Sequence, residues 1–196
     1  MLILVRHGES TGNADGLLLG RIDAPLTDRG IAQARSVAPS LAGVARVISS
    51  PLGRARQTAE ELGLGLPVEV DDRWIEVDYG EFDGWPLDKV PADTWREWRS
   101  DPHFRPPGGE TLAEVGIRVR SACDELFATD GQGARGDGDV VVVSHVSPIK
   151  AATCWGLGLP DEGAWRLYLA TASVTRLAQG PGGVVLRGYN HTPWSG

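Results

Sequence analysis

The sequence predicts an α/β fold, a three-layer α/β/α sandwich with a mostly parallel central sheet. Short runs rich in β-branched residues alternate with amphipathic stretches of helical period along the chain. The two richest runs, Leu2–Val5 and Val140–Val143, are apolar on both faces, which is typical of parallel strands covered by helices on both sides. Neither an internal repeat nor a compositional boundary divides the sequence, so we expect a single domain over residues 1–196.

The predicted strands and helices alternate along the chain as this sandwich requires. Strands are expected at Leu2–Arg6, Arg46–Ser50, Val68–Trp74, Asp139–His145, Ser173–Gln179 and Val184–Tyr189. Recognisable start signals mark three of the helices between them. The signals are Thr27 before Asp28–Leu41, Pro51 in the first turn after Ser50, and a Thr111–Glu114 capping box before a run that ends near Phe127.

Two stretches interrupt this alternation. Residues 78–109 are dense in Pro, Gly and Trp, and we expect them to form an excursion with a short helix around Thr94–Arg99. Trp85 and Trp98 in this excursion are candidates for lining a ligand site, although tryptophans more often anchor cores and loops. The second stretch, Thr129–Gly138, is polar and rich in Gly, so we expect a flexible connector there.

Charge excludes two classes of partner. The 26 acidic residues outnumber the 19 Lys and Arg, which gives a formal net charge of −7 and a sequence pI near 5.1. An acidic protein repels phosphate backbones and anionic lipids, so we expect neither nucleic acid nor a membrane surface as a partner. The same net charge opposes long-range attraction of an anionic substrate. A homo-oligomer is compatible with the sequence.

The sequence favours a cytoplasmic location and no metal or cofactor. The apolar run after Met1 ends at Arg6, which is too short for a secretory signal, and no apolar stretch approaches the roughly 18 residues of a membrane span. Cys123 and Cys154 lack CxxC spacing, so neither a disulfide framework nor a zinc site is expected. The four histidines also lack a metal-binding spacing.

Both of the most apolar strands end at a histidine. The run Arg6-His7-Gly8 closes the first strand, and His145 ends the strand that begins at Asp139. Ligands of open α/β sheets bind beyond the carboxyl ends of the strands. If the two strands are neighbours, both imidazoles project into the same crevice. Gly8 is expected to let the backbone turn sharply and approach a ligand closely.

Two further groups suit a phosphoryl ligand. Arg54 lies in the first turn of a helix, where a guanidinium fork and free amide donors can bind a phosphoryl group. Glu76 is expected at the end of another strand and is a candidate proton donor. Asp78, Glu81 and Glu9 are nearby alternatives for that donor.

These motifs together reveal a resemblance. The chain resembles the histidine phosphatase superfamily, also called the phosphoglycerate mutase-like family, through six blocks in the family's order: LVRHGESTGN, PLTDRGIAQA, SSPLGRARQTA, WIEVDYGEFDG, GGET and VVVSHVSPIK. Its short length and the blocks GGET and SHVSPIK are most similar to the small branch that includes α-ribazole phosphatases and acid phosphatase domains. The resemblance implies one histidine phosphatase domain, with the excursion at about 78–109 over the active site.

The resemblance implies a role for each matched residue. His7 matches the nucleophile that becomes phosphohistidine, and Glu76 matches the carboxylate that protonates the leaving oxygen. The positions implied to bind the substrate phosphate are Arg6, Asn13, Gly20, Arg54, His145 and Val146. Of these, the two arginines and His145 are also implied to be catalytic. Many members have Gly-Gly after the second histidine, whereas this chain has Val146-Ser147, and the Val146 N–H is still expected to donate to phosphate.

The implied activity is metal-independent hydrolysis of a small soluble phosphate ester through a phosphohistidine on His7. Phosphoryl transfer depends mainly on positioning and charge stabilisation, which fixed Arg, His and Asn donors supply. We expect a backbone carbonyl near Gly8 to fix the tautomer of His7. The alternatives are phosphoryl transfer of the phosphoglycerate mutase type and a catalytically inactive phosphate-binding module. The natural substrate does not follow from the sequence.

Overall fold

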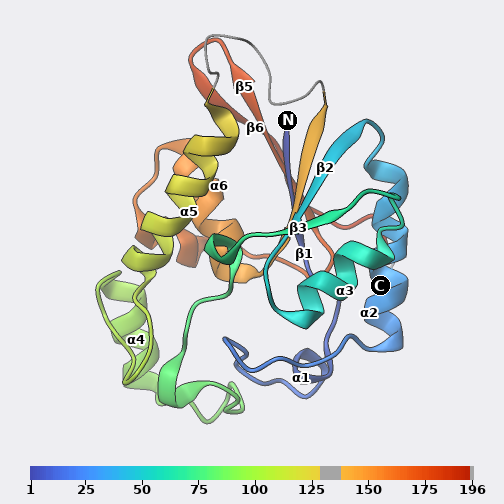
Figure 1. The fold of residues 1–196 in the computed structure, drawn as a ribbon. Coiled ribbons are helices and arrows are strands. Elements are labelled where there is room, and N and C mark those ends of the chain that lie inside the picture. The colour runs from blue at the N-terminus through green and yellow to red at the C-terminus, as the bar shows by residue number, and fades with distance from the viewer. Residues whose placement is uncertain (129–137, 195–196) are drawn as a thin grey trace.

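The computed structural model describes residues 1–128 and 138–194 (Figure 1). Within this part of the chain, one sheet has the strand order β3-β2-β4-β1-β5-β6. The strands are β1 (Leu2–Arg6), β2 (Val44–Ser49), β3 (Val68–Val70), β4 (Asp139–Ser144), β5 (Val174–Gly180) and β6 (Gly183–His191). The first four run parallel, β5 is antiparallel to β1, and β6 is antiparallel to β5. The predicted mostly parallel sheet is confirmed.

Helices cover both faces of this sheet (Figure 1). The α-helices are α1 (Thr11–Ala14), α2 (Asp28–Val37), α3 (Gly53–Glu61), α4 (Ala92–Ser100), α5 (Leu112–Phe127) and α6 (Val146–Leu157). Leu2 and Leu4 of β1 pack with α5 and α6, whereas Ile3 and Val5 pack with α2 and α3. Alternate side chains of a strand point to opposite faces. The predicted three-layer α/β/α sandwich is therefore confirmed.

No helix in the described ranges is long and apolar enough to span a bilayer.

The excursion has a small aromatic core of its own. Its helix α4 covers the stretch predicted around Thr94–Arg99. Trp98 is only 1% exposed and packs edge-to-face against Tyr79 and Phe104. Trp85, in contrast, is 42% exposed. Figure 1 shows α4 at the end of the molecule where the parallel strands terminate.

The strand predicted over Val68–Trp74 is wrong beyond Val70. The Asp71 carboxylate accepts a hydrogen bond from the backbone N–H of Arg73 and caps a 3₁₀ turn over Asp72–Trp74. An aspartate that bonds its own backbone two residues on competes with strand pairing. Glu76 therefore lies in a loop rather than at a strand end.

The helix predicted over Asp28–Leu41 ends at Val37. Pro39 has no N–H, and its ring clashes with the carbonyl four residues earlier, so the α-helix cannot continue through it. A 3₁₀ turn over Ala38–Ser40 follows instead.

Two of the three predicted start signals are confirmed. Thr27 accepts from the backbone of α2, and Thr111 forms the reciprocal capping box with Glu114 at the start of α5. Pro51, expected inside the first turn of α3, lies before the N-cap residue Leu52. The connector expected over 129–138 lies outside the described residues apart from Gly138.

Candidate active site

His7 is held in one tautomer by its own chain. The side chain follows the end of β1, is 3% exposed, and its Nδ1 lies 2.7 Å from the carbonyl oxygen of Gly8. Because a carbonyl can only accept, Nδ1 carries the proton and donates it. The lone pair is then on Nε2, the atom suited to nucleophilic attack. This is the backbone contact expected near Gly8.

The register of β1 and β4 brings the second imidazole beside the first. Arg6 pairs with Ser144 across the two strands, so His7 and His145 leave neighbouring strand ends. Their ring centroids lie 5.1 Å apart. His145 is fully buried, and its Nε2 lies 2.7 Å from the hydroxyl oxygen of Ser50. The two histidines thus have the proximity expected of them.

Gly8 is required by packing against α2. A Cβ at Gly8 would lie 2.3 Å from the carbonyl oxygen of Gly30. The N–H of Gly8 also donates to the hydroxyl of Thr58 at 3.0 Å. Gly8 thus lies against the first turn of α2, which leaves no space for a side chain. Its close approach to a ligand stays a prediction.

Arg54 is oriented by a series of hydrogen bonds that starts in the excursion. Its two terminal nitrogens donate to the carbonyl oxygens of Ile22 and Gly20, each at 2.8 Å. The Asp83 carboxylate accepts the N–H groups of Gly20, Arg21 and Ile22 at 2.7, 2.7 and 2.8 Å. Asp83 thus shapes the loop whose carbonyls hold Arg54. Asp83 lies in the WIEVDYGEFDG block, but no role was predicted for it.

Gly20 and Asn13 make contacts that differ in part from those expected. Both backbone groups of Gly20 are engaged, the N–H with Asp83 and the carbonyl with Arg54, so Gly20 supports an arginine rather than presenting its N–H to phosphate. The Asn13 carbonyl oxygen accepts from the N–H and the hydroxyl of Ser10 at 3.1 and 2.9 Å. This fixes the amide and leaves its NH₂ as the donor for a ligand.

Glu76 binds the first turn of α6. Its carboxylate accepts the N–H of Val77 at 2.8 Å, and those of Val146 and Ser147 at 3.1 Å each. The side chain is 3% exposed. The N–H of Val146, expected to donate to phosphate, donates to Glu76 in this structure. Two residues directly after His145 therefore hold the carboxylate in place.

The three alternative carboxylates have other partners or lie in solvent. Glu9 accepts from the Thr27 hydroxyl at 2.9 Å and pairs with Arg29 at 3.2 Å. Asp78 accepts the N–H of Gly80 within its own turn, and Glu81 is exposed. Of the four acids considered, Glu76 is the one that these contacts tie to the His145 segment.

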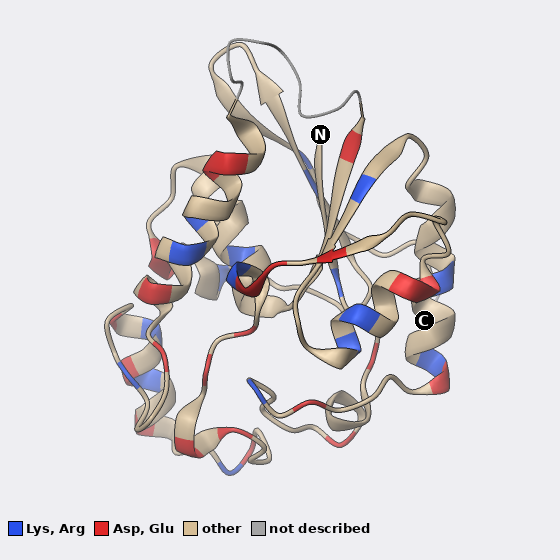
Figure 2. Cartoon of the chain, viewed as in Figure 1, with Lys and Arg blue, Asp and Glu red and all other residues tan. Residues whose placement is uncertain are grey.

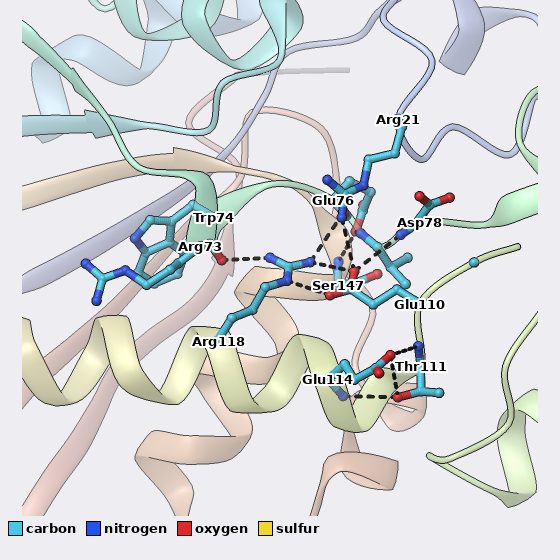
Figure 3. Close-up of polar contacts among 12 residues, drawn as sticks. Arg21, Arg73, Trp74, Glu76, Asp78, Glu110, Thr111, Glu114, Arg118 and Ser147 are labelled. Atoms are coloured by element: carbon cyan, nitrogen blue, oxygen red, sulfur yellow. Dashed lines mark hydrogen bonds and ion pairs between the residues drawn. The ribbon is translucent and has the colours of Figure 1, made fainter.

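An ion-pair network on α5 fixes the loop that carries Glu76 (Figure 3). Arg118 donates to both carboxylate oxygens of Glu110, at 2.8 and 3.0 Å. The same guanidinium donates to the backbone carbonyls of Arg73 at 2.7 Å and of Glu76 at 3.3 Å. Glu110 lies in the GGET block, but sequence reasoning gave it no role and did not select Arg118. The only signal was the block itself, which contains Glu110 but not Arg118.

Burial and the arginines keep both histidines neutral. Burial is the main cause that lowers the pKa of His7 well below 6.5, and the positive charges of Arg6 and Arg54 lower it further. The pKa of His145 is lowered in the same way, first by burial and then by Arg54 and His7. Burial also lowers the pKa of the Arg6 and Arg54 guanidinium groups, but from an ordinary value of 12.5. A neutral nucleophile thus lies among cationic donors.

These two pKa shifts predict that the protein loses stability as the pH falls below about 6.5. The unfolded chain protonates both histidines near pH 6.5 whereas the folded chain does not, so the unfolded state binds more protons and gains in relative stability. Each histidine contributes at most about 1.4 kcal/mol per pH unit. Thermal unfolding of the wild type and of the double variant His7→Gln/His145→Gln between pH 7 and 5 checks this.

The double variant should lose less stability on acidification than the wild type, whereas His103→Gln, an exposed control, should behave like the wild type. An identical pH dependence in all three proteins would contradict the burial of neutral imidazoles.

Charged residues elsewhere are mixed in sign. Figure 2 shows basic and acidic positions interspersed over the helices, with no continuous basic face in this view. Within the described residues, no group of three or more His, Cys, Asp or Glu side chains is arranged to hold a metal ion. The positive charges near His7 are those of Arg6 and Arg54, and in this view they are not part of a larger basic face.

Comparison with known proteins agrees with this arrangement. The profile of the histidine phosphatase superfamily (branch 1) matches residues 2–192. The solved structure of a mycobacterial glucosyl-3-phosphoglycerate phosphatase with VO3 is 32% identical, covers 96% of this chain and 98% of that chain, and has a TM-score of 0.86. The structure of a candidate α-ribazole-5′-P phosphatase from Escherichia coli is 28% identical, covers 97% and 96%, and has a TM-score of 0.81.

A curated relative has a mutase name. The probable phosphoglycerate mutase GpmB of Yersinia pestis (strain Pestoides F) is 32% identical over 200 residues, which cover 97% of this chain and 86% of that protein. The matched profile, the shared fold and these identities agree over nearly the whole sequence. The chain therefore belongs to branch 1 of the histidine phosphatase superfamily.

Proposed function

We propose that this protein is a phosphomonoesterase that hydrolyses a small phosphate ester without a metal, through a phosphohistidine on His7. The observation that carries the proposal is the His7 imidazole, held with Nε2 as its free nitrogen and lying 5.1 Å from the ring of His145. The family and the phosphatases among its relatives support phosphomonoester hydrolysis.

The first step transfers the phosphoryl group to the enzyme. The Nε2 lone pair of His7 attacks phosphorus while the bond from phosphorus to the ester oxygen breaks. Arg6, Arg54 and His145 stabilise the charge on the equatorial oxygens. Glu76, as the carboxylic acid, gives its proton to the leaving oxygen. The alcohol then departs.

The second step regenerates the enzyme. The Glu76 carboxylate takes a proton from water, whose oxygen attacks phosphorus and breaks the P–N bond to His7. Inorganic phosphate leaves, Nε2 regains its lone pair, and Glu76 is again protonated. No residue outside this set is required for the proton balance.

A mutase would pass the phosphoryl group from His7 to a second hydroxyl instead of to water. The excursion of residues 78–109 is short and carries one α-helix, α4, and a 3₁₀ turn over Gly80–Phe82. We take this as support for hydrolysis, because the resemblance implies longer insertions around the substrate in mutases of the family.

Hydrolysis and mutase activity give different products from one substrate. With 3-phosphoglycerate and a catalytic amount of bisphosphoglycerate, we expect inorganic phosphate to form at least about tenfold faster than 2-phosphoglycerate, because water has access to the phosphoenzyme. Colorimetric phosphate release and an enolase-coupled assay measure the two products. Faster formation of 2-phosphoglycerate would contradict the phosphatase assignment and establish the mutase.

The proposed setting is the cytoplasm, with a small-molecule substrate and neither nucleic acid nor a membrane as a partner. Support comes from the free thiols of Cys123 and Cys154, both buried, and from the interspersed positions of acidic and basic residues in Figure 2. Burial raises the pKa of the Cys154 thiol to about 11, so it stays protonated and unreactive at neutral pH. Fractionation of the native host would test this location.

A further inference from the structure

A buried serine stands beside the second histidine of the site. The strands β1, β4 and β2 are neighbours in the sheet, and His7, His145 and Ser50 each directly follow one of them. Ser50 is completely buried, and its backbone N–H donates to the carbonyl oxygen of Val143 in β4 at 2.9 Å. Its hydroxyl oxygen lies 2.7 Å from Nε2 of His145. The strand order thus places a hydroxyl on the imidazole that the proposed mechanism uses to stabilise phosphoryl charge.

His145 has a single ring proton to place. Burial and then the positive charge of Arg54 lower its pKa well below the ordinary value, so the folded ring is neutral at pH 7. A neutral imidazole has one N–H donor and one acceptor nitrogen, and the hydrogen bond of one nitrogen sets the role of the other. Because Nε2 bonds to Ser50, Nδ1 is the nitrogen left for a ligand. The direction of the Ser50 bond therefore decides whether His145 offers a ligand a proton or a lone pair.

The other contact of the Ser50 hydroxyl favours one direction. Its oxygen accepts the backbone N–H of Leu52 at 3.4 Å, and among the residues that the structure describes its own proton has no acceptor besides Nε2 of His145. The opposite direction would leave this buried hydroxyl proton without an acceptor, which is costly. With the hydroxyl donating to Nε2, the imidazole proton lies on Nδ1.

Nδ1 of His145 is a buried atom without a partner. It forms no hydrogen bond within the described ranges, and this includes the ring of His7, whose centroid is 5.1 Å away. A protonated Nδ1 is therefore a buried donor that lacks an acceptor, and such donors are rare in folded proteins. An oxygen of the transferring phosphoryl group is the acceptor that the proposed mechanism brings next to His7. The unused donor thus fits a ligand oxygen.

We propose that Ser50 positions the proton of the second histidine: its hydroxyl donates to Nε2 of His145, so that Nδ1 carries the proton and donates it to an equatorial oxygen of the phosphoryl group. Charge that develops on this oxygen strengthens the bond in the transition state. In the opposite tautomer, the Nδ1 lone pair would face the oxygen and repel it. Ser50 acts through His145 and is a positioning residue. The inference rests on the proposed function, because it assigns an atom of His145 to phosphoryl transfer.

NMR locates the ring proton of His145 without turnover. Long-range ¹H–¹⁵N spectra of protein labelled with ¹⁵N-histidine distinguish protonated from unprotonated ring nitrogens, and the signals that disappear in His145→Gln assign the ring. At neutral pH we expect the proton on Nδ1 in the wild type and in Ser50→Thr. In Ser50→Ala part of the population should move to Nε2, because the bond that holds the proton on Nδ1 is lost. A wild-type spectrum with the His145 proton on Nε2 would overturn the proposal, even if a variant fails to fold.

Kinetics measure the consequence for catalysis. Ser50→Ala should lower kcat by about 10²-fold, as expected when one donor to the transferring group is lost, whereas Ser50→Thr keeps the hydroxyl and should stay within about fivefold of the wild type. Thr153→Val is the matched control, because it removes a buried hydroxyl that donates to the Ile149 carbonyl within α6. It should keep full activity and the wild-type spectrum. Unchanged kcat in a folded Ser50→Ala protein would contradict the inference.

Failure of the proposed function would look different, because none of these proteins would hydrolyse an ester. The wild-type spectrum would still show whether Ser50 directs the proton of His145. Calorimetric binding of inorganic phosphate then tests the donor, and Ser50→Ala should bind phosphate about tenfold more weakly than the wild type. Equal binding by both proteins would reject the role of Ser50.

Discussion

Replacement of His7 by alanine is expected to lower kcat/KM for every phosphate ester by about 10⁴-fold or more, because it removes the attacking nitrogen. The variant keeps Arg6, Arg54 and His145, so it should still bind phosphate while failing to cleave esters. Phosphate release from an activated aryl phosphate and from an alkyl phosphate measures the loss. His103→Ala, at an exposed histidine of the excursion, is the control that should keep full activity.

The phosphoenzyme provides a second measurement of the same prediction. Rapid quenching of wild type with a ³²P-labelled ester should trap a protein-bound phosphate that survives alkali and is lost in acid, as expected of a phosphoramidate. The His7→Ala protein should trap none. Turnover or labelling retained in this variant would refute His7 as nucleophile, and activity lost on incubation with excess EDTA would refute a metal-independent reaction.

Glu76→Gln is expected to slow poor leaving groups far more than activated ones. An alkyl phosphate needs a proton on its leaving oxygen, so kcat should fall by about 10²- to 10³-fold, whereas p-nitrophenyl phosphate should lose less than about tenfold. The physical reason is that an amide cannot donate the proton that the carboxylic acid gives. A plot of log kcat against leaving-group pKa for both proteins measures the difference in slope.

The hydrogen bonds of Glu76 require a control for structural damage. Its carboxylate accepts three backbone N–H groups, and a glutamine places an NH₂ against at least one of them. Thermal unfolding and inorganic phosphate binding should therefore accompany the kinetics, with Glu81→Gln as the exposed control. An equal loss for both leaving groups in a folded variant would remove Glu76 as the general acid.

Local sequence was sufficient for most of the fold. The apolar runs at Leu2–Val5 and Val140–Val143 predicted buried parallel strands, and the capping residues Thr27 and Thr111 predicted two helix starts. Each of these signals acts within a few residues, where side-chain periodicity and backbone capping are decided. The wrong strand end also has a local cause. The strand pattern predicted a strand to Trp74, but Asp71 caps a 3₁₀ turn and β3 ends at Val70.

For the candidate site, too, the sequence predicted one part and the tertiary structure decided the other. The sequence by itself determined that His7 and His145 stand at the ends of apolar strands and that Arg54 begins a helix. Only the tertiary structure decided that β1 lies beside β4, which brings the imidazoles to 5.1 Å, and that α6 holds Glu76.

Most of the contacts that sequence reasoning misassigned or missed join distant segments. Gly20 supports Arg54 across 34 residues, Asp83 shapes the Gly20 loop across 63, and Arg118 reaches the Glu76 carbonyl across 42. Such bonds depend on which backbone groups the folded chain brings together, and no periodicity or motif records that choice. The sequence thus determined the chemistry available at the strand ends. Packing of the excursion, α5 and α6 against the sheet decided which groups hold the site and which are free for a ligand.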